Sequence, residues 1–165
     1  MRKIVLISLS ILCLVGCDYT SKKVAKNELK NMSIQSYLGG SLQFAYVENT
    51  GGVLGMGSNL SEKTRLVVFR YFVTLMLMLL FAYTIFKKGI SKWTTISFVF
   101  ILSGGIGNLI DRFTNEGKVI DFIIIGMFDY HTGIFNIADV YVTVGVLLII
   151  ISTASNKHYS VRKTT

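Results

Sequence analysis

Two aspartates in the second half of the chain are candidates for acid–base chemistry. Asp121 stands in the apolar run VIDFIII and Asp139 in FNIADV, and neither has a cation beside it in the sequence. Burial among apolar residues disfavours the charged form of a carboxyl, so we expect the pKa of at least one of them to be raised. If the fold brings them together, one can hold a proton while the other takes a proton from water. The structural alternative is that Asp121 ends an exposed strand and Asp139 caps a helix.

A second polar group precedes these aspartates. Asn108, Asp111 and Arg112 stand at positions i, i+3 and i+4, which places them on one face of a helix. We expect them to satisfy one another's hydrogen bonds and charge there. Ionisable residues among apolar stretches of membrane length are costly, which makes them candidates for function.

The elements that must position these residues are predicted to be membrane helices. Apolar residues make up 52% of the 165 positions, more than is typical of a soluble globule. A helix needs roughly 20 apolar residues to cross a bilayer. We therefore expect one polytopic domain over residues 1–165, with four spans joined by two outer loops. The spans are predicted at about 4–23, 64–86, 94–111 and 135–153, and the outer loops at about 24–63 and 112–134.

The outer loops also contain two predicted strands. In LQFAYVE, residues 42–48, apolar and other residues alternate, as in a strand lying on a surface. VIDFIIIGMF, residues 119–128, is too short to span a membrane and rich in β-branched residues, which favours a strand or a re-entrant piece. The predicted fold class is therefore a membrane all-α core of four transmembrane helices with a small extracytoplasmic β-rich part on the membrane surface. Asn59 and Glu62 are predicted to form the capping box of the second span.

The charges indicate the orientation of the chain in the membrane. The net charge of +8 comes from basic residues gathered at both termini and in the turn that contains Lys87, Lys88 and Lys92. They form no stripe interleaved with aromatic residues, which argues against nucleic-acid binding. The positive-inside rule places both termini in the cytoplasm and the polar motifs at the outer face, although the long first loop also carries lysines. Lys22, Lys23 and Arg70 are expected to snorkel to the outer interface.

The cysteines leave two interpretations open. Cys13 and Cys17 lie four apart in an apolar helix, with no further histidine or cysteine nearby, so we predict neither a disulfide nor a metal site. LVGC, residues 14–17, follows a basic start and an apolar run, and it matches the cleavage site of a bacterial lipoprotein signal peptide. The other interpretation is that Gly16 and Cys17 form a small surface for helix packing.

Several motifs carry a family resemblance. GNLIDR (107–112), VIDF (119–122) and FNIAD (135–139), in this order and spacing, resemble the three C-terminal motifs of lipoprotein signal peptidase, also called signal peptidase II. DYTSK (18–22) resembles the first motif of that family and ENTGGVLG (48–55) the second. The chain departs from the family at Leu54, where an aromatic residue is usual, and at Gly52, where alanine is common.

The resemblance implies an aspartic endopeptidase of the bacterial cytoplasmic (inner) membrane. It would remove signal peptides from diacylglyceryl-modified prolipoproteins, cutting before the lipidated cysteine, with no metal or cofactor. Its partners would be these signal peptides and membrane phospholipid, and we expect a monomer. The resemblance assigns catalysis to Asp121 and Asp139. It implies positioning or substrate binding for Asp18, Lys22, Asn49, Gly51, Asn108, Asp111, Arg112 and Asn136.

Three alternatives have other functions or none. A small transporter subunit could relay ions or protons through intramembrane carboxylates, but it needs polar faces through the full depth of the membrane. The inner halves of the second and fourth spans, LMLMLLFAYTIF and VLLIIIS, carry almost no polar side chains. A structural membrane module would use the same polar residues for helix packing. A catalytically inactive paralogue would keep the fold without turnover.

Overall fold

The computed structural model describes residues 2–127 and 130–161, without the side chains of Leu54, Met127 and residues 155–161. The departure from the family at Leu54 therefore lies outside what is described, as do the last basic residues, Arg162 and Lys163. The helices are α1 (Arg2–Leu29), α2 (Glu62–Leu66), α3 (Val73–Phe86), α4 (Lys92–Thr114) and α5 (Ile137–Val161), and the π-helical segment η3 (Val67–Phe72) joins α2 to α3.

Four helical stretches are long and apolar enough to cross a membrane. They are Arg2–Leu29, Glu62–Phe86, Lys92–Thr114 and Ile137–Ala154. Together with a small antiparallel sheet, they confirm the predicted fold class of a helical membrane core with a β-rich part. The first helix extends past the expected end at residue 23, because Asp18 and Lys22 face the protein interior and α1 continues beyond them to meet the sheet.

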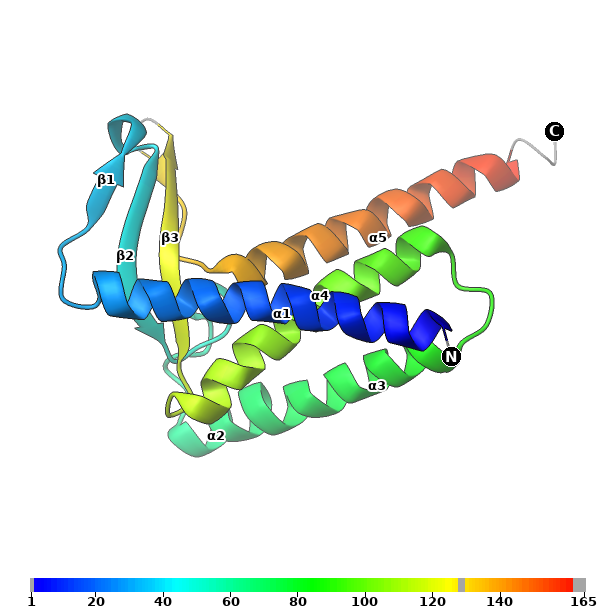
Figure 1. Ribbon diagram of the computed structural model, residues 1–165, viewed down its shortest axis with the longest axis horizontal. Helices are drawn as coiled ribbons and strands as arrows, with labels where there is room; N and C mark the ends of the chain where they lie inside the picture. Colours follow the sequence, from blue (N-terminus) through cyan, green and yellow to red (C-terminus); the bar gives the residue numbers. More distant parts are fainter. Residues whose placement is uncertain (1, 128–129, 162–165) are drawn as a thin grey trace.

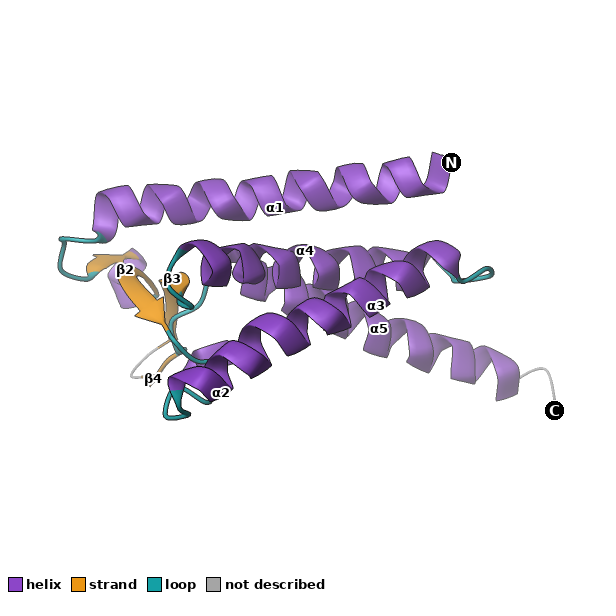
Figure 2. Ribbon diagram, turned by 90° about the horizontal axis from the view of Figure 1, so that it is seen from below, coloured by secondary structure: helices purple, strands orange, loops and turns teal. Residues whose placement is uncertain are grey.

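The sheet stands across one end of the helix bundle (Figure 1). The start of α1, the turn between α3 and α4 and the end of α5 all lie toward the opposite end. Helix α4 is central: α1 lies on one side of it, and α3 and α5 lie on the other (Figure 2). Residues at the sheet end of α4 are therefore positioned to meet side chains from every other long helix.

The sheet has the strand order β1-β2-β3-β4, with β1 (Gln35–Tyr37), β2 (Leu42–Asn49), β3 (Val119–Met127) and β4 (Tyr130–His131) all antiparallel to their neighbours. Both strands predicted from the sequence are present, as β2 and β3. Val47 pairs with Asp121, and the register then shifts before the pair of Phe44 with Ile123. Such irregularities bend a strand and re-aim its side chains, and this one lies next to Asp121.

Helices α4 and α5 pack closely because glycines face the partner helix. A Cβ at Gly104 would collide with the carbonyl oxygen of Ala138, and one at Gly145 would lie 2.7 Å from the carbonyl oxygen of Ser97. Small residues at such positions let membrane helices approach with dense van der Waals contact. This packing brings the sheet end of α4 beside the first turn of α5.

The predicted capping box of the second span is wrong. Ser61 is the N-cap of α2, and its Oγ accepts a hydrogen bond from the backbone N–H of Thr64 at 3.2 Å. The turns through Gly57 and Leu60 continue up to this point, so the helix begins at Glu62 and not after Asn59. Glu62 then lies in the first turn, where its negative charge suits the helix dipole.

Candidate active site

Asp121 is buried on β3, with 1% of its surface exposed. Its two carboxylate oxygens accept hydrogen bonds from the side-chain amides of Asn136, at 2.6 Å, and of Asn49, at 2.9 Å. The pKa of Asp121 is raised to about 6: burial is the largest cause, the hydrogen bonds from Asn49 and Asn136 oppose the shift, and the charge of Asp139 adds to it. Asp121 therefore does not end an exposed strand, and the expectation of a raised pKa holds for this carboxyl.

Asp139 lies in the first turn of α5 and is half-buried. It forms a reciprocal cap with Asn136: the backbone N–H of Asn136 donates to Asp139 Oδ2 at 3.2 Å, and the backbone N–H of Asp139 donates to Asn136 Oδ1 at 3.0 Å. The other carboxylate oxygen accepts from the side-chain amide of Asn108 at 2.8 Å. Asp139 therefore caps its helix, and it is also held by a residue of α4.

Asn136 connects the two carboxyl groups. Its side-chain NH₂ donates to Asp121 and also to Asn108 Oδ1 at 3.1 Å, while its oxygen accepts from the backbone of Asp139. Both aspartates line one cavity of about 270 Å³, together with Asn49 and Asn108. The fold thus brings together two carboxyl groups that are 18 residues apart in sequence, as the numbers 121 and 139 give.

Lys22 is a buried cation behind the aspartates, with 1% of its surface exposed. Its ammonium donates a hydrogen bond to Asn108 Oδ1 at 2.9 Å and forms ion pairs with Asp18 Oδ2 at 2.9 Å and Asp111 Oδ2 at 3.0 Å. The prediction that Lys22 snorkels to the interface is therefore wrong. The carboxylates compensate the charge inside the bundle, where an unpaired ammonium would be far more costly.

Asp18 ties α1 to the start of α5. Its Oδ1 accepts from the backbone N–H of Ala138 at 2.8 Å, at the positive end of the helix. Gly107 makes room for this carboxylate, since a Cβ there would collide with Asp18 Oδ2. Asp18 therefore holds the turn that carries Asp139.

Arg112 and Asp111 do not satisfy one another, contrary to the prediction from their spacing. Asp111 binds Lys22 and accepts from the backbone N–H of Ile120 at 3.1 Å. Arg112 donates to the carbonyl oxygens of Gly51 and Gly117. The two side chains leave α4 toward different neighbours, so Asp111 fixes the strand that carries Asp121, and Arg112 fixes the loop after β2.

The loop after β2 closes one side of the cavity. Asn49 Oδ1 accepts from the backbone N–H of Gly51 at 2.9 Å, while its NH₂ reaches both Asp121 and the carbonyl oxygen of Gly52. Gly51 must lack a side chain, because a Cβ would lie 2.5 Å from the carbonyl oxygen of Gly55. The loop is thus folded around the amide that binds Asp121.

Nothing in the sequence singles out Phe69, an aromatic residue in a long apolar run. Its ring lies under the guanidinium of Arg112, 4.8 Å from Cζ to the ring centroid, and it lines the cavity. It also packs on the loop, since a Cβ at Gly52 would lie 3.2 Å from the ring. Only the fold distinguishes this ring from its lipid-facing neighbours.

Within residues 2–127 and 130–161 we find no group of three histidine, cysteine, aspartate or glutamate side chains arranged to hold a metal ion. The oxygens of Asp121 and Asp139 are instead occupied by amide donors. What this arrangement can do chemically is move protons between two carboxyl groups and a reactant in the cavity.

The chain is similar to known proteins over most of its length. The family model described as signal peptidase (SPase) II matches residues 10–155. A lipoprotein signal peptidase of Streptococcus thermophilus (strain CNRZ 1066) is 35% identical over 156 residues, covering 92% of this chain and 93% of that protein. Another from Borrelia turicatae (strain 91E135) is 34% identical over 131 residues, covering 76% of this chain and 75% of that protein.

A solved structure shows the same architecture. A bacterial membrane enzyme determined in meso at 2.3 Å resolution superposes with a TM-score of 0.79 at 28% identity, covering 92% of this chain and 89% of that one. The four apolar helices and these relatives fit a multi-pass bacterial membrane protein. Because the matched residues 10–155 include both aspartates and the amides that hold them, the chain belongs to the signal peptidase II family.

Proposed function

We propose that this protein is a lipoprotein signal peptidase that hydrolyses its substrate with Asp121 and Asp139 as an aspartic dyad. The substrate would be a diacylglyceryl-modified prolipoprotein, cut just before the lipidated cysteine. The observation that carries the proposal is the bridge of Asn136 between two carboxyl groups that face one cavity. Family membership supports the reaction, and the bridge supports the mechanism.

The two carboxyl groups would divide the proton transfers. Asp121, with its raised pKa, holds the shared proton and gives it to the scissile carbonyl oxygen. Asp139 then takes the proton of the attacking water, whose oxygen bonds to the carbonyl carbon. When the tetrahedral intermediate collapses, one of its hydroxyls returns a proton to Asp121 as the carbonyl re-forms, Asp139 gives its proton to the nitrogen, and the C–N bond breaks to release the amine of the lipidated cysteine. Both carboxyl groups are regenerated in the exchange.

The remaining polar residues would keep this geometry in a dry site. Asn49, Asn108 and Asn136 orient the carboxylates through hydrogen bonds, which are stronger where water is excluded. Lys22 donates a hydrogen bond to Asn108 Oδ1, and Asp18 and Asp111 compensate the charge of Lys22. Arg112 fixes the loop at Gly51 against the cavity, where it would position the substrate backbone.

The dyad would work at the extracytoplasmic face of the membrane. The aspartates lie at the sheet end of the bundle, and the basic start of α1 and the turn after α3 lie at the other end (Figure 1). Basic residues mark the cytoplasmic side, which supports cytoplasmic termini and an outer active site.

A transporter would need a polar path through the whole bundle. The described interior has no such path in the half away from the sheet. The core there is formed by Ile7, Ile11, Val15, Val99 and Leu102. The buried hydroxyls of Ser97 and Ser103 donate to carbonyl oxygens of their own helix. The polar network stops at Asp18 and Lys22, which suits a site open at one face.

Cleavage of a purified lipidated precursor by the reconstituted protein tests the function. We expect mass spectrometry to find a mature fragment that begins at the lipidated cysteine. Asp121→Asn and Asp139→Asn should each lower kcat by about 10²-fold or more, because each removes one half of the proton exchange. The melting temperature of each variant in detergent checks that the fold is intact.

An unlipidated precursor is the matched substrate control and should be left uncut. Thr20→Ala, on the exposed face of α1, is the matched protein control and should keep wild-type turnover. Near-normal turnover by either aspartate variant would refute the dyad. An inactive wild-type protein with an intact melting transition would identify an inactive paralogue.

A further inference from the structure

Arg70 is a cation in the second candidate membrane span, and its charge is incompletely compensated. It lies in the middle of the π-helical segment Val67–Phe72 of the second span, and π-helical turns recur at functional sites. Its Nε is buried without a hydrogen-bond partner, and within residues 2–127 and 130–161 no carboxylate forms an ion pair with it. The predicted snorkelling into the headgroups is therefore incomplete, since part of the guanidinium is enclosed by protein.

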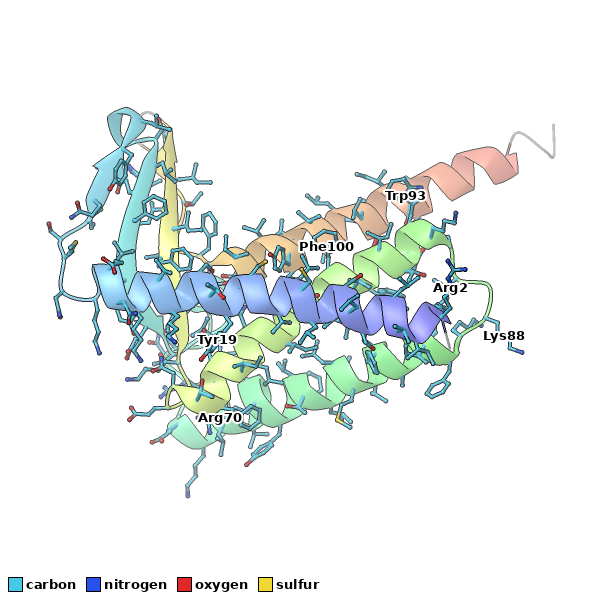
Figure 3. All side chains as sticks on the ribbon, viewed as in Figure 1. Arg2, Tyr19, Arg70, Lys88, Trp93 and Phe100 are labelled. Carbon is cyan, nitrogen blue, oxygen red and sulfur yellow. The ribbon has the colours of Figure 1, made fainter. Side chains whose placement is uncertain are left out.

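The guanidinium lies against the end of α4. Its carbon is 5.7 Å from the ring centroid of Phe113, and a Cβ at Gly117 would approach Nη2 to 3.3 Å. Figure 3 shows Arg70 at the sheet end of the bundle, where η3 and the end of α4 lie side by side. In the same turn, the side-chain Nδ2 of Asn115 is also buried without a partner. A buried donor without a partner is costly, and an acceptor from outside the chain would satisfy the guanidinium of Arg70.

A small cavity of about 80 Å³ opens beside Arg70. Arg65, Arg70 and Arg112 line it together with Thr50, and Glu62 and Glu116 contribute carboxylates to the wall. The three guanidinium groups and two carboxylates give the cavity wall a net positive charge. Arg112 donates to the carbonyl oxygens of Gly51 and Gly117, and Arg65 Nη1 donates to those of Ser58 and Leu60. Of these three guanidinium groups, Arg70 is the one whose buried Nε has no hydrogen-bond partner.

The surroundings identify the ligand as a lipid. Tyr71 and Phe72, which follow Arg70 in its segment, and Phe113, which lies against its guanidinium, are more than half exposed, with 59%, 55% and 53% of their surfaces open. Aromatic residues of this kind gather at the level of the headgroups of a bilayer. Guanidinium groups bind phosphate oxygens through paired, charge-assisted hydrogen bonds. We propose that this cavity binds the phosphodiester of a membrane phospholipid, with Arg70 as the principal ligand and the acyl chains along the exposed aromatic residues.

This site is separate from the dyad, although Phe69 and Arg112 line both cavities. A phospholipid held there would form part of the wall beside the catalytic cavity. The proposal does not depend on the protease mechanism, because lipid binding is measured without turnover.

Native mass spectrometry of the purified protein with two lipids of identical acyl chains tests the proposal. We expect phosphatidylglycerol to be retained about tenfold or more over diacylglycerol, which lacks the phosphate. Arg70→Gln should lower this preference by about tenfold, and Arg70→Lys should give an intermediate value, because lysine keeps the charge without the planar pair of donors. Lys63→Gln is the matched control: it removes an exposed charge from α2, does not line the cavity, and should retain the preference.

Several outcomes would overturn the proposal. They are equal retention of both lipids by the wild-type protein, an unchanged preference in Arg70→Gln, and an equal loss in Lys63→Gln, which would indicate general electrostatic attraction. Displacement of the lipid by millimolar inorganic phosphate would show a site for free phosphate, and displacement by a stoichiometric lipidated precursor would assign the cavity to the substrate. If the Arg70 variants fail to fold, the wild-type comparison with diacylglycerol still decides.

Discussion

Amide groups organise the two aspartates. Asn136 alone makes contacts with Asp121, Asp139 and Asn108, and an amide can do this because it offers both donors and an acceptor. A lysine or arginine in the same place would lower the pKa of both carboxyls and remove the proton that one of them must hold. The neutral bridge keeps the pair oriented while burial keeps the pKa of Asp121 high.

The raised pKa of Asp121 predicts the alkaline limb of the activity profile. A carboxyl whose pKa is about 6 instead of 3.8 stays protonated at pH values between these two numbers. It loses its proton when the pH rises above about 6. A doubly ionised dyad cannot protonate the scissile carbonyl, so kcat/KM should fall as the pH rises through about 6. The acid limb of the profile reflects protonation of both carboxyls. The two apparent pKa values of the profile belong to the pair and not to either residue alone. Initial rates at subsaturating substrate across the pH range measure this profile.

The profile has two controls. Glu28→Gln removes an exposed carboxyl of α1 and should leave both limbs in place. A metal chelator should leave the rates unchanged at every pH. A profile that rises with a single ionisation, or rates that zinc restores after chelation, would contradict the aspartic mechanism.

The buried cation predicts a contrast between two substitutions. Lys22→Met leaves Asp18 and Asp111 buried without their cation, which should destabilise the fold by about 3–5 kcal/mol. Asp111→Asn should be much milder, because the Asn oxygen can accept from both Lys22 and the backbone N–H of Ile120, as Asp111 Oδ2 does. Melting temperatures and yields of folded protein in detergent separate the two.

Lys23→Met is the matched control for this contrast, since Lys23 is the exposed neighbour on α1. It should melt like the wild-type protein. If Asp111→Asn is as unstable as Lys22→Met, the carboxylate itself is required and the account of shared acceptors is wrong.

At the scale of single residues, the sequence indicated which polar residues gather at the site. It was less informative about which residues each of them contacts. The apolar settings of Asp121 and Asp139 predicted burial, and Asp121 is buried. The partners of Arg112 were mispredicted, because spacing on one helix takes no account of strands and loops that are distant in sequence. Arg112 does not pair with the adjacent Asp111. Tertiary packing brings the carbonyl oxygens of Gly51 and Gly117 to its guanidinium, which donates to them instead.

At the scale of elements, α1 shows what its own pattern could have predicted. Its buried residues are Ile7, Ile11, Val15, Asp18, Lys22 and Ala25, which recur every three or four positions along one face. This period alone places Asp18 and Lys22 on the same stripe as the apolar core. The strands β2 and β3 were predicted from alternation and β-branching, but their pairing was not, because it joins residues at least 70 positions apart, such as Asn49 and Val119.

Close packing of α4 on α5 predicts the effect of one added methyl group. A Cβ at Gly104 would lie 2.7 Å from Val142 Cγ2 and even closer to the carbonyl oxygen of Ala138. The helices must separate, at a cost of about 1–3 kcal/mol for an overpacked contact. Asn108 lies one turn after Gly104, and Asp139 follows Ala138 directly, so the hydrogen bond between them should loosen. We expect Gly104→Ala to lower kcat by about tenfold to 10²-fold, measured beside its melting temperature.

Gly16→Ala is the matched control for this prediction. No heavy atom lies within 4 Å of where its Cβ would be placed, so both turnover and melting temperature should stay at wild-type values. Wild-type turnover by Gly104→Ala would show that the α4–α5 distance does not set the geometry of the dyad.

At the scale of the whole molecule, the distribution of charge opposes a simple assignment of orientation. Arg2 and Lys88 lie at the end away from the sheet (Figure 3), while lysines such as Lys23 and Lys26 lie near the sheet end of α1. Lysines at the sheet end conflict with the positive-inside rule if that end is extracytoplasmic. The structure reduces this conflict, because the charge of Lys22 is compensated inside the bundle by Asp18 and Asp111. The lysines that stay exposed precede the long segment from residue 30 to 61, where basic residues have less influence on topology.

The orientation that follows is a prediction about which positions an impermeant reagent can reach. In a background where Cys13 and Cys17 are replaced by serine, Ser33→Cys, in the loop after α1, should react with a membrane-impermeant maleimide in intact spheroplasts. Lys88→Cys, in the turn after α3, should react only after the membrane is opened. Both positions are exposed, so a permeant maleimide should label both and serves as the control. The reverse pattern would place the dyad on the cytoplasmic side, where a precursor that is still crossing the membrane would not present its cleavage site to Asp121 and Asp139.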